Sequence, residues 1–480
     1  MLSPWKLLAV SSTFWLAVVL FVVGVGCRLL AGGRPGALDS ALRHMRALLT
    51  STAVLTGMSA LTLPVAAFAV YMNYVAPWDV MQDIASARQI LRGETAYPVD
   101  LGPLIRTELR RDAPRVSLGR WFPSLREKEA NETGGFLSRQ AHPPLLILLH
   151  VPPTALFSAR GAALAADLLS LALYVVMLWL LCRAVLSGID TRMVLLLAVA
   201  GLGWSPIVDT LRQGQSGLVI AAVLVSAWYC LRSDRPVAAG VFVGLAVCLK
   251  LYPGLLLVYL AARLRRALVS AVVTILLCVA ATGLVLGWSV FQEYLTVAQG
   301  TSTAFGGSPL NVSFPALLGK NGVAVNHVAW MAIGVTLVGV CLWFMHRPLA
   351  ATLSRELLDL EYSLFLIAAL LISPVTWNHY FPSLLLPLVV TARLVVSNRP
   401  GWGNVLPLLV FLVLFAIPVD TLVFWFANQR SPQTVSRLGA SLPNVFLAAS
   451  WLSLLSFYAG RAADLSSPVR AGQDARAPGT

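Results

Sequence analysis

Long apolar segments recur along nearly the whole chain, and they constrain its fold more than any other sequence feature. A membrane helix needs about 20 mostly apolar residues. The candidate segments are 5–26, 49–75, 143–158, 162–182, 193–207, 214–231, 236–262, 267–287, 326–345, 359–376, 380–396, 404–426 and 442–459. Because 58% of the residues are hydrophobic and only 12% are charged, soluble globular and disordered proteins are excluded. We therefore predict an all-α polytopic membrane protein with about 12–14 membrane segments.

Two of these segments carry internal breaks. The run 236–262 is interrupted by Lys250-Leu251-Tyr252-Pro253, which predicts a hairpin of two short helices with this tetrapeptide at its tip. The run 143–158 contains Pro152-Pro153, and we expect that it does not cross the membrane fully. Both breaks would place irregular backbone at membrane depth, which is tolerated only where protein or water surrounds it.

Basic residues predict the orientation of the segments, since Lys and Arg collect in cytoplasmic loops. The linker 27–48 carries four arginines and one acid, and further arginines follow 214–231, 236–262 and 442–459. The net charge of +14 is therefore interpreted as topology and not as nucleic-acid binding. We expect the N-terminus outside and the C-terminus in the cytoplasm. The outer stretches would then be 76–141, 288–325 and a short turn near 377–380.

The first outer loop holds an unusual share of the chain's charge. Residues 79–139 contain ten lysines and arginines and nine aspartates and glutamates, about a third of all charged residues. Within this loop, 80–92 and 103–111 are predicted to be short amphipathic helices lying on the membrane surface. Loops of this length are usually functional, so we interpret the loop as a small polar cap.

Two carboxylates open this cap. Asp79 directly follows Pro77-Trp78, and Asp83 lies four residues further on, which would place both on one helix face. One interpretation is a general base with its partner, and a second is a pair of metal ligands. A third is purely structural, because Asp79 is a good N-cap for the helix that follows.

Other polar residues stand at or inside apolar segments, where ionisable groups are costly and are often functional. His379 lies in a Pro-broken, aromatic-rich turn, as an acid, base or phosphate ligand or as a satisfied interfacial histidine. Lys250 lies far from either end of its run, and a buried cation needs an anion such as phosphate. Arg212 and Lys320 are further candidates, with solvated surface charges as the alternative. The histidines lack metal-ligand spacing, and no Walker loop occurs.

Several short motifs occur in an order that is typical of one enzyme family. They are Asp79-Val80-Met81-Gln82 with Ala85 to Gly93, His142-Pro143-Pro144, Gly214-Gln215, Gly240 to Lys250-Leu251-Tyr252-Pro253, Asn311-Val312-Ser313 with Lys320, and Ser373-Pro374 with Trp377-Asn378-His379. Over residues 79–380 this pattern resembles glycosyltransferase family 87, of the GT-C superfamily. The chain departs from the family pattern at several positions. His142 replaces a Tyr, Gly217 stands where Asn is common, Lys320 replaces an Arg, and Tyr380 stands where a second His is frequent.

The resemblance implies a domain organisation. Residues 49–460 would form a GT-C-like bundle with a long outer first loop, 76–141, and a second outer loop, 288–325. The segment 1–48 would add one membrane helix and a cytoplasmic linker before the family core. The tail 461–480 is rich in Ala, Ser, Pro and Gly, and we expect it to be cytoplasmic and disordered.

The resemblance also implies a reaction, the inverting single-displacement transfer of a sugar from a polyprenyl phosphate, with no metal expected. Asp79 would be the base, with His379 as its partner or as a phosphate contact. The donor phosphate or lipid would be bound by Lys250, Arg212, Lys320, Gln215, Asn311 and Ser313. The sugar or acceptor would be contacted by Asp83, Trp78, Tyr97, His142, Trp377 and Tyr380.

The partners follow from the same resemblance. They are a polyprenyl-phosphate-linked hexose or pentose, with a mannose-like sugar favoured, a membrane-associated glycan, glycolipid or protein acceptor, and the bilayer. The enzyme would lie in a bacterial plasma membrane with its site on the extracytoplasmic side. We expect no nucleic-acid partner and no cofactor, and a monomer. The alternative function is a transporter or flippase of lipid-linked intermediates, which an inverted repeat would favour, and none is visible in the sequence.

Overall fold

The computed structural model describes residues 52–75, 77, 79–111, 140–185, 191–306, 308–323, 326–345, 354–397 and 433–466. Within these residues all regular structure is helical, so the predicted all-α class is confirmed. The predicted segments 5–26 and 404–426 lie outside the described residues. Among the described residues, four helical stretches are long and apolar enough to cross a membrane: Ala159–Val185, Arg265–Leu286, Val328–Met345 and Ala440–Gly460.

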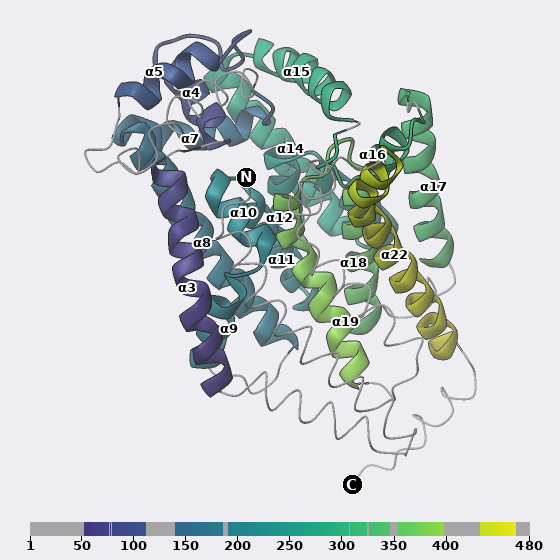
Figure 1. Ribbon diagram of the computed structural model, residues 1–480. Helices are drawn as coiled ribbons and strands as arrows, with labels where there is room; N and C mark the ends of the chain where they lie inside the picture. Colours follow the sequence, from purple (N-terminus) through teal and green to yellow (C-terminus); the bar gives the residue numbers. More distant parts are fainter. Residues whose placement is uncertain are drawn as a thin grey trace.

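Upright helices form the body of the molecule (Figure 1). They are α3 (Thr52–Val75), α8 (Ala159–Val185), α9 (Thr191–Gly201), α11 (Gly217–Arg232), α12 (Pro236–Leu249), α13 (Leu255–Arg263), α14 (Arg265–Leu286), α17 (His327–Met345), α18 (Arg355–Ile372), α19 (Leu385–Ser397) and α22 (Gln433–Ser466). α22 continues into the segment that was expected to be a disordered tail.

Shorter helices gather toward one end of this body (Figure 1). They are α4 (Val80–Leu91), α5 (Gly102–Arg111), α7 (Pro144–Leu156), α10 (Ser205–Gln213), α15 (Ser289–Phe305) and α16 (Phe314–Lys320). The helices of the two predicted outer loops, α4 with α5 and α15 with α16, therefore share one end of the molecule.

The two predicted cap helices exist, but α4 does not lie on a surface. Nearly every residue from Val80 to Gln89 is buried, the polar Asp83 and Ser86 included. α4 packs against α5, α7 and α8, because Ile84 and Ala85 join the small residues at the start of α8 in one apolar cluster. The expectation of a surface helix at 80–92 is therefore wrong. α4 is buried in the protein, and its carboxylate Asp83 is buried with it.

The run 236–262 is broken at the predicted place. α12 ends at Leu249, and the 3-10 helix η2 (Tyr252–Gly254) separates it from α13. α12 packs most extensively on α14, where Gly240 and Gly244 let the helix backbones approach closely. A Cβ on Gly240 would lie 2.1 Å from the carbonyl oxygen of Ala267, so no larger residue fits. This packing holds the end of α12, and with it Lys250, in a fixed position.

α7 is also short, as its two prolines predicted. It has 13 residues, which at 1.5 Å per residue gives a length of about 20 Å, less than the ~30 Å apolar core of a bilayer. Its first turn follows His142-Pro143, and Pro144 starts the helix at a position where no N–H partner is needed. α7 is therefore too short to cross the bilayer. Its start places His142 at the end of the molecule where the short helices pack.

Two buried carboxylates fasten α18 to its neighbours. Asp359 accepts a hydrogen bond from Trp228 Nε1 at 2.8 Å and forms an ion pair with Arg232, both on α11. Glu361 pairs with Arg263 of α13 and accepts from the Tyr458 hydroxyl of α22 at 2.8 Å. Charges buried in this way persist only when they are paired and hydrogen-bonded.

Removing one partner of the Arg263–Glu361 pair should strongly destabilise the bundle. Glu361→Ala would leave the buried guanidinium and the Tyr458 hydroxyl without their acceptor, which costs about 3–5 kcal/mol. Thermal unfolding in detergent should show a lower midpoint. Arg355→Ala, which alters an exposed residue of the same helix, should change the free energy of unfolding by about 0.5 kcal/mol or less. Equal midpoints for the two variants would contradict this role.

Candidate functional site

A tight turn between α10 and α11 sets one wall of the candidate site. Gly214 ends α10 in the left-handed conformation, with a φ of 64°. A Cβ at this position would lie 2.7 Å from the Cβ of Val80 and 2.8 Å from Asn73 Nδ2. Glycine is therefore required both for the backbone conformation and for the close approach to α3 and α4. The turn presents the next residue, Gln215, to the start of α4.

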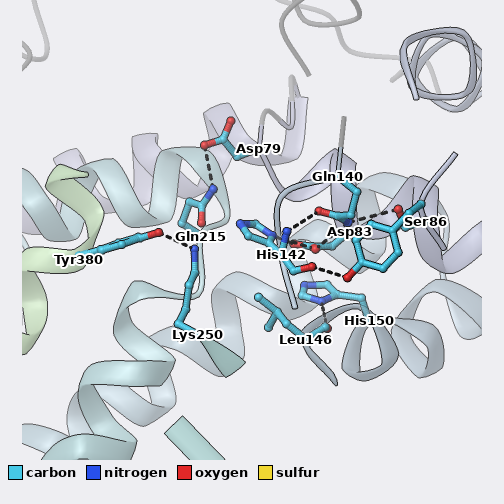
Figure 2. A network of polar contacts seen from close by, with 11 residues as sticks. Asp79, Asp83, Ser86, Gln140, His142, Leu146, His150, Gln215, Lys250 and Tyr380 are labelled. Atoms are coloured by element: carbon cyan, nitrogen blue, oxygen red, sulfur yellow. Dashed lines mark hydrogen bonds and ion pairs between the residues drawn. The ribbon is translucent and has the colours of Figure 1, made fainter. Parts of the chain in front are cut away.

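Asp79 is bound by this glutamine rather than by its own helix. Gln215 Nε2 donates to Asp79 Oδ2 at 2.8 Å (Figure 2), while Asp79 makes no side-chain cap bond to α4. The capping interpretation is therefore excluded. Burial, reinforced by Asp209, raises the pKa of Asp79 to about 6, although the Gln215 bond and the nearby Arg212 and Lys250 act in the opposite direction. A carboxylate with such a pKa is a competent proton acceptor near neutral pH.

Lys250 stands at the break after α12, and its side chain is buried. Its Nζ donates to the Tyr380 hydroxyl at 3.0 Å (Figure 2) and lies 4.6 Å from the centre of that ring. Tyr380 in turn stacks on Tyr252 of η2 with a centroid distance of 5.3 Å. Among the described residues no carboxylate lies within ion-pair distance of this ammonium group. Within the described part of the chain, Lys250 is thus a buried cation whose hydrogen-bond partner is neutral.

The charge of Lys250 nevertheless reaches the other ionisable groups of the site. Burial is the largest influence on the pKa of each of these groups, and the Lys250 charge also acts on them all: Asp79, Asp83, His142 and His379. One ammonium group is therefore near enough to two carboxylates and two imidazoles to affect the pKa of each. This arrangement matches the environment that an anionic substrate group requires.

His379 enters from the 3-10 helix η4 (Asn378–Leu384). Its backbone packs against the start of α11, where a Cβ on Gly217 would lie only 1.8 Å from the His379 carbonyl oxygen. Glycine is needed here because no side chain fits, which explains why this chain lacks the Asn that is common in the family pattern. Burial, with a further contribution from Lys250, holds the pKa of His379 well below its usual value, so the imidazole is neutral.

Several buried polar atoms in this region have no hydrogen-bond partner among the described residues. They are Gln215 Oε1, Ser216 Oγ, Asn378 Nδ2 and His379 Nε2. The first two belong to the α10–α11 turn and the other two to η4, which packs directly on α10 and α11. Buried polar atoms in proteins are nearly always hydrogen-bonded. Their concentration next to Asp79 and Lys250 indicates where a polar ligand binds.

A second cluster surrounds Asp83. His142 Nδ1 lies 2.9 Å from both Asp83 carboxylate oxygens, and Gln140 Nε2 donates to Asp83 Oδ1 and to Ser86 Oγ, at 3.2 Å each (Figure 2). Tyr97 donates to the His142 carbonyl at 2.6 Å. Burial alone would raise the pKa of Asp83, but the His142 imidazole and smaller contributions hold it below its usual value. Asp83 is therefore a carboxylate with a bound imidazole.

Gln140 and Ser86 were not recognised from the sequence. Gln140 accepts from the His142 amide at 3.1 Å and so orders the backbone that carries the imidazole. A polar residue two positions before a histidine and a serine inside an amphipathic pattern give no usable signal on their own. Only the packing of α4 against the start of α7 brings them together.

Other predicted site residues lie in separate contacts. Lys320 Nζ donates to the Ala440 carbonyl and to Asn444 Oδ1, both at 2.8 Å, which ties α16 to α22. Burial lowers the pKa of Lys320 to about 7. Arg212 Nη2 bonds to Asp209 at 3.1 Å within α10. Trp78 lies outside the described residues.

Asn311 and Ser313 connect two loops. The Asn311 amide donates to the Pro374 carbonyl at 2.9 Å and accepts from the Thr376 amide at 2.9 Å, while Ser313 caps α16. Trp377, next along the chain, packs edge-on against Phe305 with a centroid distance of 5.4 Å. These contacts hold the segment that leads into η4, and a direct role of the three residues in substrate binding stays a prediction.

A metal site finds little support in the geometry. Over the described ranges, no group of three or more His, Cys, Asp or Glu side chains is arranged to hold a metal ion. Asp79 and Asp83 turn to different partners, Gln215 and His142. The expectation that the reaction needs no cofactor stays a prediction.

The fold and the site together define an all-α membrane protein with a half-buried acid, a buried amide and a buried lysine at broken helix ends. Residues 141–374 match the sequence model of glycosyltransferase family 87, so the resemblance predicted from the motifs is confirmed over this range. The matched range includes His142, Gln215 and Lys250, and Asp79 precedes it.

Two curated relatives share part of the sequence, and both are named polyprenol-phosphate-mannose-dependent alpha-(1-2)-phosphatidylinositol mannoside mannosyltransferase. The chain is 26% identical to the one from Mycolicibacterium smegmatis over 223 residues, 44% of this chain and 49% of the relative. It is 27% identical to the one from Mycobacterium tuberculosis over 239 residues, 48% of this chain and 53% of the relative. The chain thus spans about half the length of these relatives. No solved structure matches the chain significantly.

The contact between α11 and η4 gives a direct test of the site's construction. Gly217→Ala places a methyl group against the His379 carbonyl, and we expect a loss of stability at the upper end of the ~1–3 kcal/mol that overpacking typically costs. Gly254→Ala is the matched control, because a Cβ on Gly254, four residues after Lys250, meets open space. Thermal unfolding of both variants in detergent checks this. A Gly217→Ala protein as stable as Gly254→Ala would show that α11 and η4 are not in contact.

Proposed function

We propose that this protein is a membrane glycosyltransferase that moves a mannose-like sugar from a polyprenyl phosphate to a membrane-associated acceptor. The family match and the names of the two relatives support the donor class. The observation that carries the proposal is the Gln215-bound carboxylate of Asp79 beside the buried ammonium of Lys250. A base for the acceptor and a cation for the leaving phosphate are the two groups that such a transfer needs.

Asp79 acts as the base in this proposal. The acceptor hydroxyl attacks the anomeric carbon from the face opposite the phosphate, and its proton passes to the Asp79 carboxylate. With a pKa of about 6, Asp79 is largely ionised at pH 7 and still basic enough to accept a proton as the new bond forms. The Gln215 amide fixes its orientation through one oxygen and leaves the other oxygen free for the acceptor.

Lys250 binds the donor phosphate and stabilises the charge that develops on it. The lysine has no carboxylate to pair with in the described part of the chain, so a phosphate supplies the missing anion. Because the ammonium is buried, its interaction with the phosphate is stronger than it would be in water. The neutral His379 and the polar atoms beside it offer hydrogen bonds to the sugar or to the phosphate without adding charge.

The lipid part of the donor remains in the bilayer beside this site. α15 lies at the site's end of the molecule and carries the exposed apolar residues Trp288, at its start, and Leu295 (Figure 1). Such residues suit the boundary between headgroups and acyl chains. We propose that this end faces the extracytoplasmic side of a bacterial plasma membrane and that the acceptor is a lipid, glycan or protein held at that surface.

The role of Asp79 predicts a defined pH dependence. Below its pKa of about 6 the carboxyl group is protonated and cannot accept the acceptor's proton, so kcat/KM should fall about tenfold per pH unit as the pH decreases. Asp79→Asn should lower transfer from a polyprenyl phosphomannose by about 10²-fold or more. Glu94→Gln, an exposed carboxylate on the segment after α4, is the control and should keep full activity. Full transfer by Asp79→Asn would refute this assignment, and lipid translocation without any transfer would refute the enzyme.

The role of Lys250 predicts a loss of donor binding. Lys250→Met keeps the apolar stem and removes the charge, so the KM for the polyprenyl phosphomannose should rise about 10-fold or more. Arg235→Met, which removes an exposed cation from the other end of α12, should leave the KM unchanged. Steady-state kinetics at saturating acceptor provides the measurement. Equal donor KM values for the two variants would place the phosphate elsewhere.

A further inference from the structure

The proposed function uses the carboxylate of Asp79. It gives no role to the pair that Asp83 forms with His142. Asp83 holds His142 through two contacts of 2.9 Å to the same ring nitrogen, Nδ1. Both side chains are almost fully buried, with 2% exposure for Asp83 and 6% for His142. An ionised carboxylate at this distance makes Nδ1 the donor and fixes the orientation of the ring.

Two neighbours, Gln140 and Tyr97, hold this pair in place. Gln140 donates to Asp83 and accepts from the backbone amide of His142. Tyr97 donates to the His142 carbonyl at 2.6 Å. Such support is what positions a reacting group within a narrow range of geometries. A histidine with only a packing role would not need hydrogen bonds to its ring, to its backbone amide and to its backbone carbonyl.

The opposite side of the ring is directed toward the candidate site. Figure 2 shows the His142 imidazole reaching from Asp83 toward Gln215 and Lys250. The described residues provide no hydrogen bond to His142 Nε2. The Lys250 charge opposes protonation of His142, and His142 in turn acts on the pKa of His379, so these groups share one electrostatic environment.

The charge balance of the proposed reaction requires a second positive group. A polyprenyl-phosphate sugar is a phosphodiester and carries a charge of about −1, whereas the polyprenyl phosphate that leaves carries about −1.5 to −2 at pH 7. Lys250 can neutralise only the charge present at the start. Catalysis depends on groups that interact more strongly with the transition state than with the bound substrate.

We propose that His142, oriented by Asp83, binds the donor phosphate through Nε2–H and stabilises the charge that this phosphate gains as the sugar leaves. This inference rests on the proposed function. His142 is then a phosphate-binding catalytic residue, while Asp83 is a positioning residue that acts through it.

The step balances as follows. A bond forms between the acceptor oxygen and the anomeric carbon, and the bond from that carbon to the phosphate oxygen breaks. The acceptor's proton goes to Asp79, and the electron pair of the broken bond remains on the phosphate oxygen. His142 Nε2–H donates a hydrogen bond to the phosphate, and the buffer in the surrounding solution gives up the proton that the imidazole takes up when the donor binds.

Proton uptake on donor binding follows from the electrostatics around the ring. The groups that face His142 are Asp83 on α4, His150 on α7, Lys250 after α12 and His379 on η4. Burial holds the pKa of His142 below its usual value in the free protein, despite the Asp83 carboxylate. A phosphate anion beside Nε2 favours the charged ring and raises that pKa. Donor affinity should therefore decrease as the pH rises, by up to about tenfold per unit for one linked proton.

The experiment measures donor binding in the Asp79→Asn protein, where turnover is blocked and Asp79 no longer titrates. The probe is a short-chain polyprenyl phosphomannose, whose phosphodiester keeps its charge between pH 6 and 8. Isothermal titration calorimetry in two buffers of different ionisation enthalpy gives both the affinity and the number of protons taken up. We expect fractional proton uptake and an affinity that falls with pH.

Adding His142→Gln should abolish the proton uptake, flatten the pH dependence and weaken binding about 10- to 100-fold at pH 6. His142→Tyr, the family's usual residue, should also abolish the uptake, and Asp83→Asn should reduce it. His150→Gln is the matched control, because the described residues give the His150 side chain one hydrogen bond, to the Leu146 carbonyl at 2.9 Å, and the variant should keep the uptake. Unchanged thermal unfolding midpoints identify the variants that remain folded.

The outcomes separate the two proposals. Donor binding without proton uptake, or with uptake that persists in both the His142→Gln and His142→Tyr proteins, contradicts the role of His142 and leaves the glycosyltransferase standing. Failure of both the Asp79→Asn and the unmodified protein to bind the donor contradicts the proposed function and this inference together.

Discussion

The buried ammonium of Lys250 is the constraint on which the rest of the site depends. Two buried carboxylates elsewhere in the described structure are paired with arginines, in the pairs Asp359–Arg232 and Glu361–Arg263. The two carboxylates whose pKa values Lys250 lowers are instead bound to an amide and to an imidazole, Asp79 by Gln215 and Asp83 by His142. A buried cation kept apart from its counter-charges costs stability, which is typical of a position reserved for an anionic ligand.

Breaks in helices create this arrangement, and they share one region of the molecule. α12 stops at Lys250, α10 turns into α11 at Gly214, and α18 leads through η4 into α19. Each break exposes polar side chains where continuous helices would bury only apolar ones. Glycines allow the broken ends to approach closely, since Gly214 contacts α4 and Gly217 contacts η4 without a side chain between them. The apolar body thus supports a small polar region that it could not otherwise tolerate.

Local signals in the sequence predicted the parts that depend on local chemistry. The break at Lys250 and the short α7 follow from proline and charge within apolar runs, and the structure contains both. Long-range packing was not predictable in this way. The pairing of Asp83 with His142 joins residues 59 positions apart. The inward burial of α4 likewise depends on α5, α7 and α8, and the contacts of Lys320 depend on α22. An amphipathic pattern shows that one helix face is polar, but not whether solvent or a binding site covers that face.

The position of the donor phosphate tests this account most directly. A structure of the protein with a bound polyprenyl phosphate would locate it without assumptions about the sugar or the acceptor. The account predicts a phosphate within hydrogen-bond distance of Lys250 Nζ and His142 Nε2, with the Asp79 carboxylate across the space that the sugar occupies. A phosphate bound at Lys320, or on the surface of the bundle away from Lys250, would contradict it.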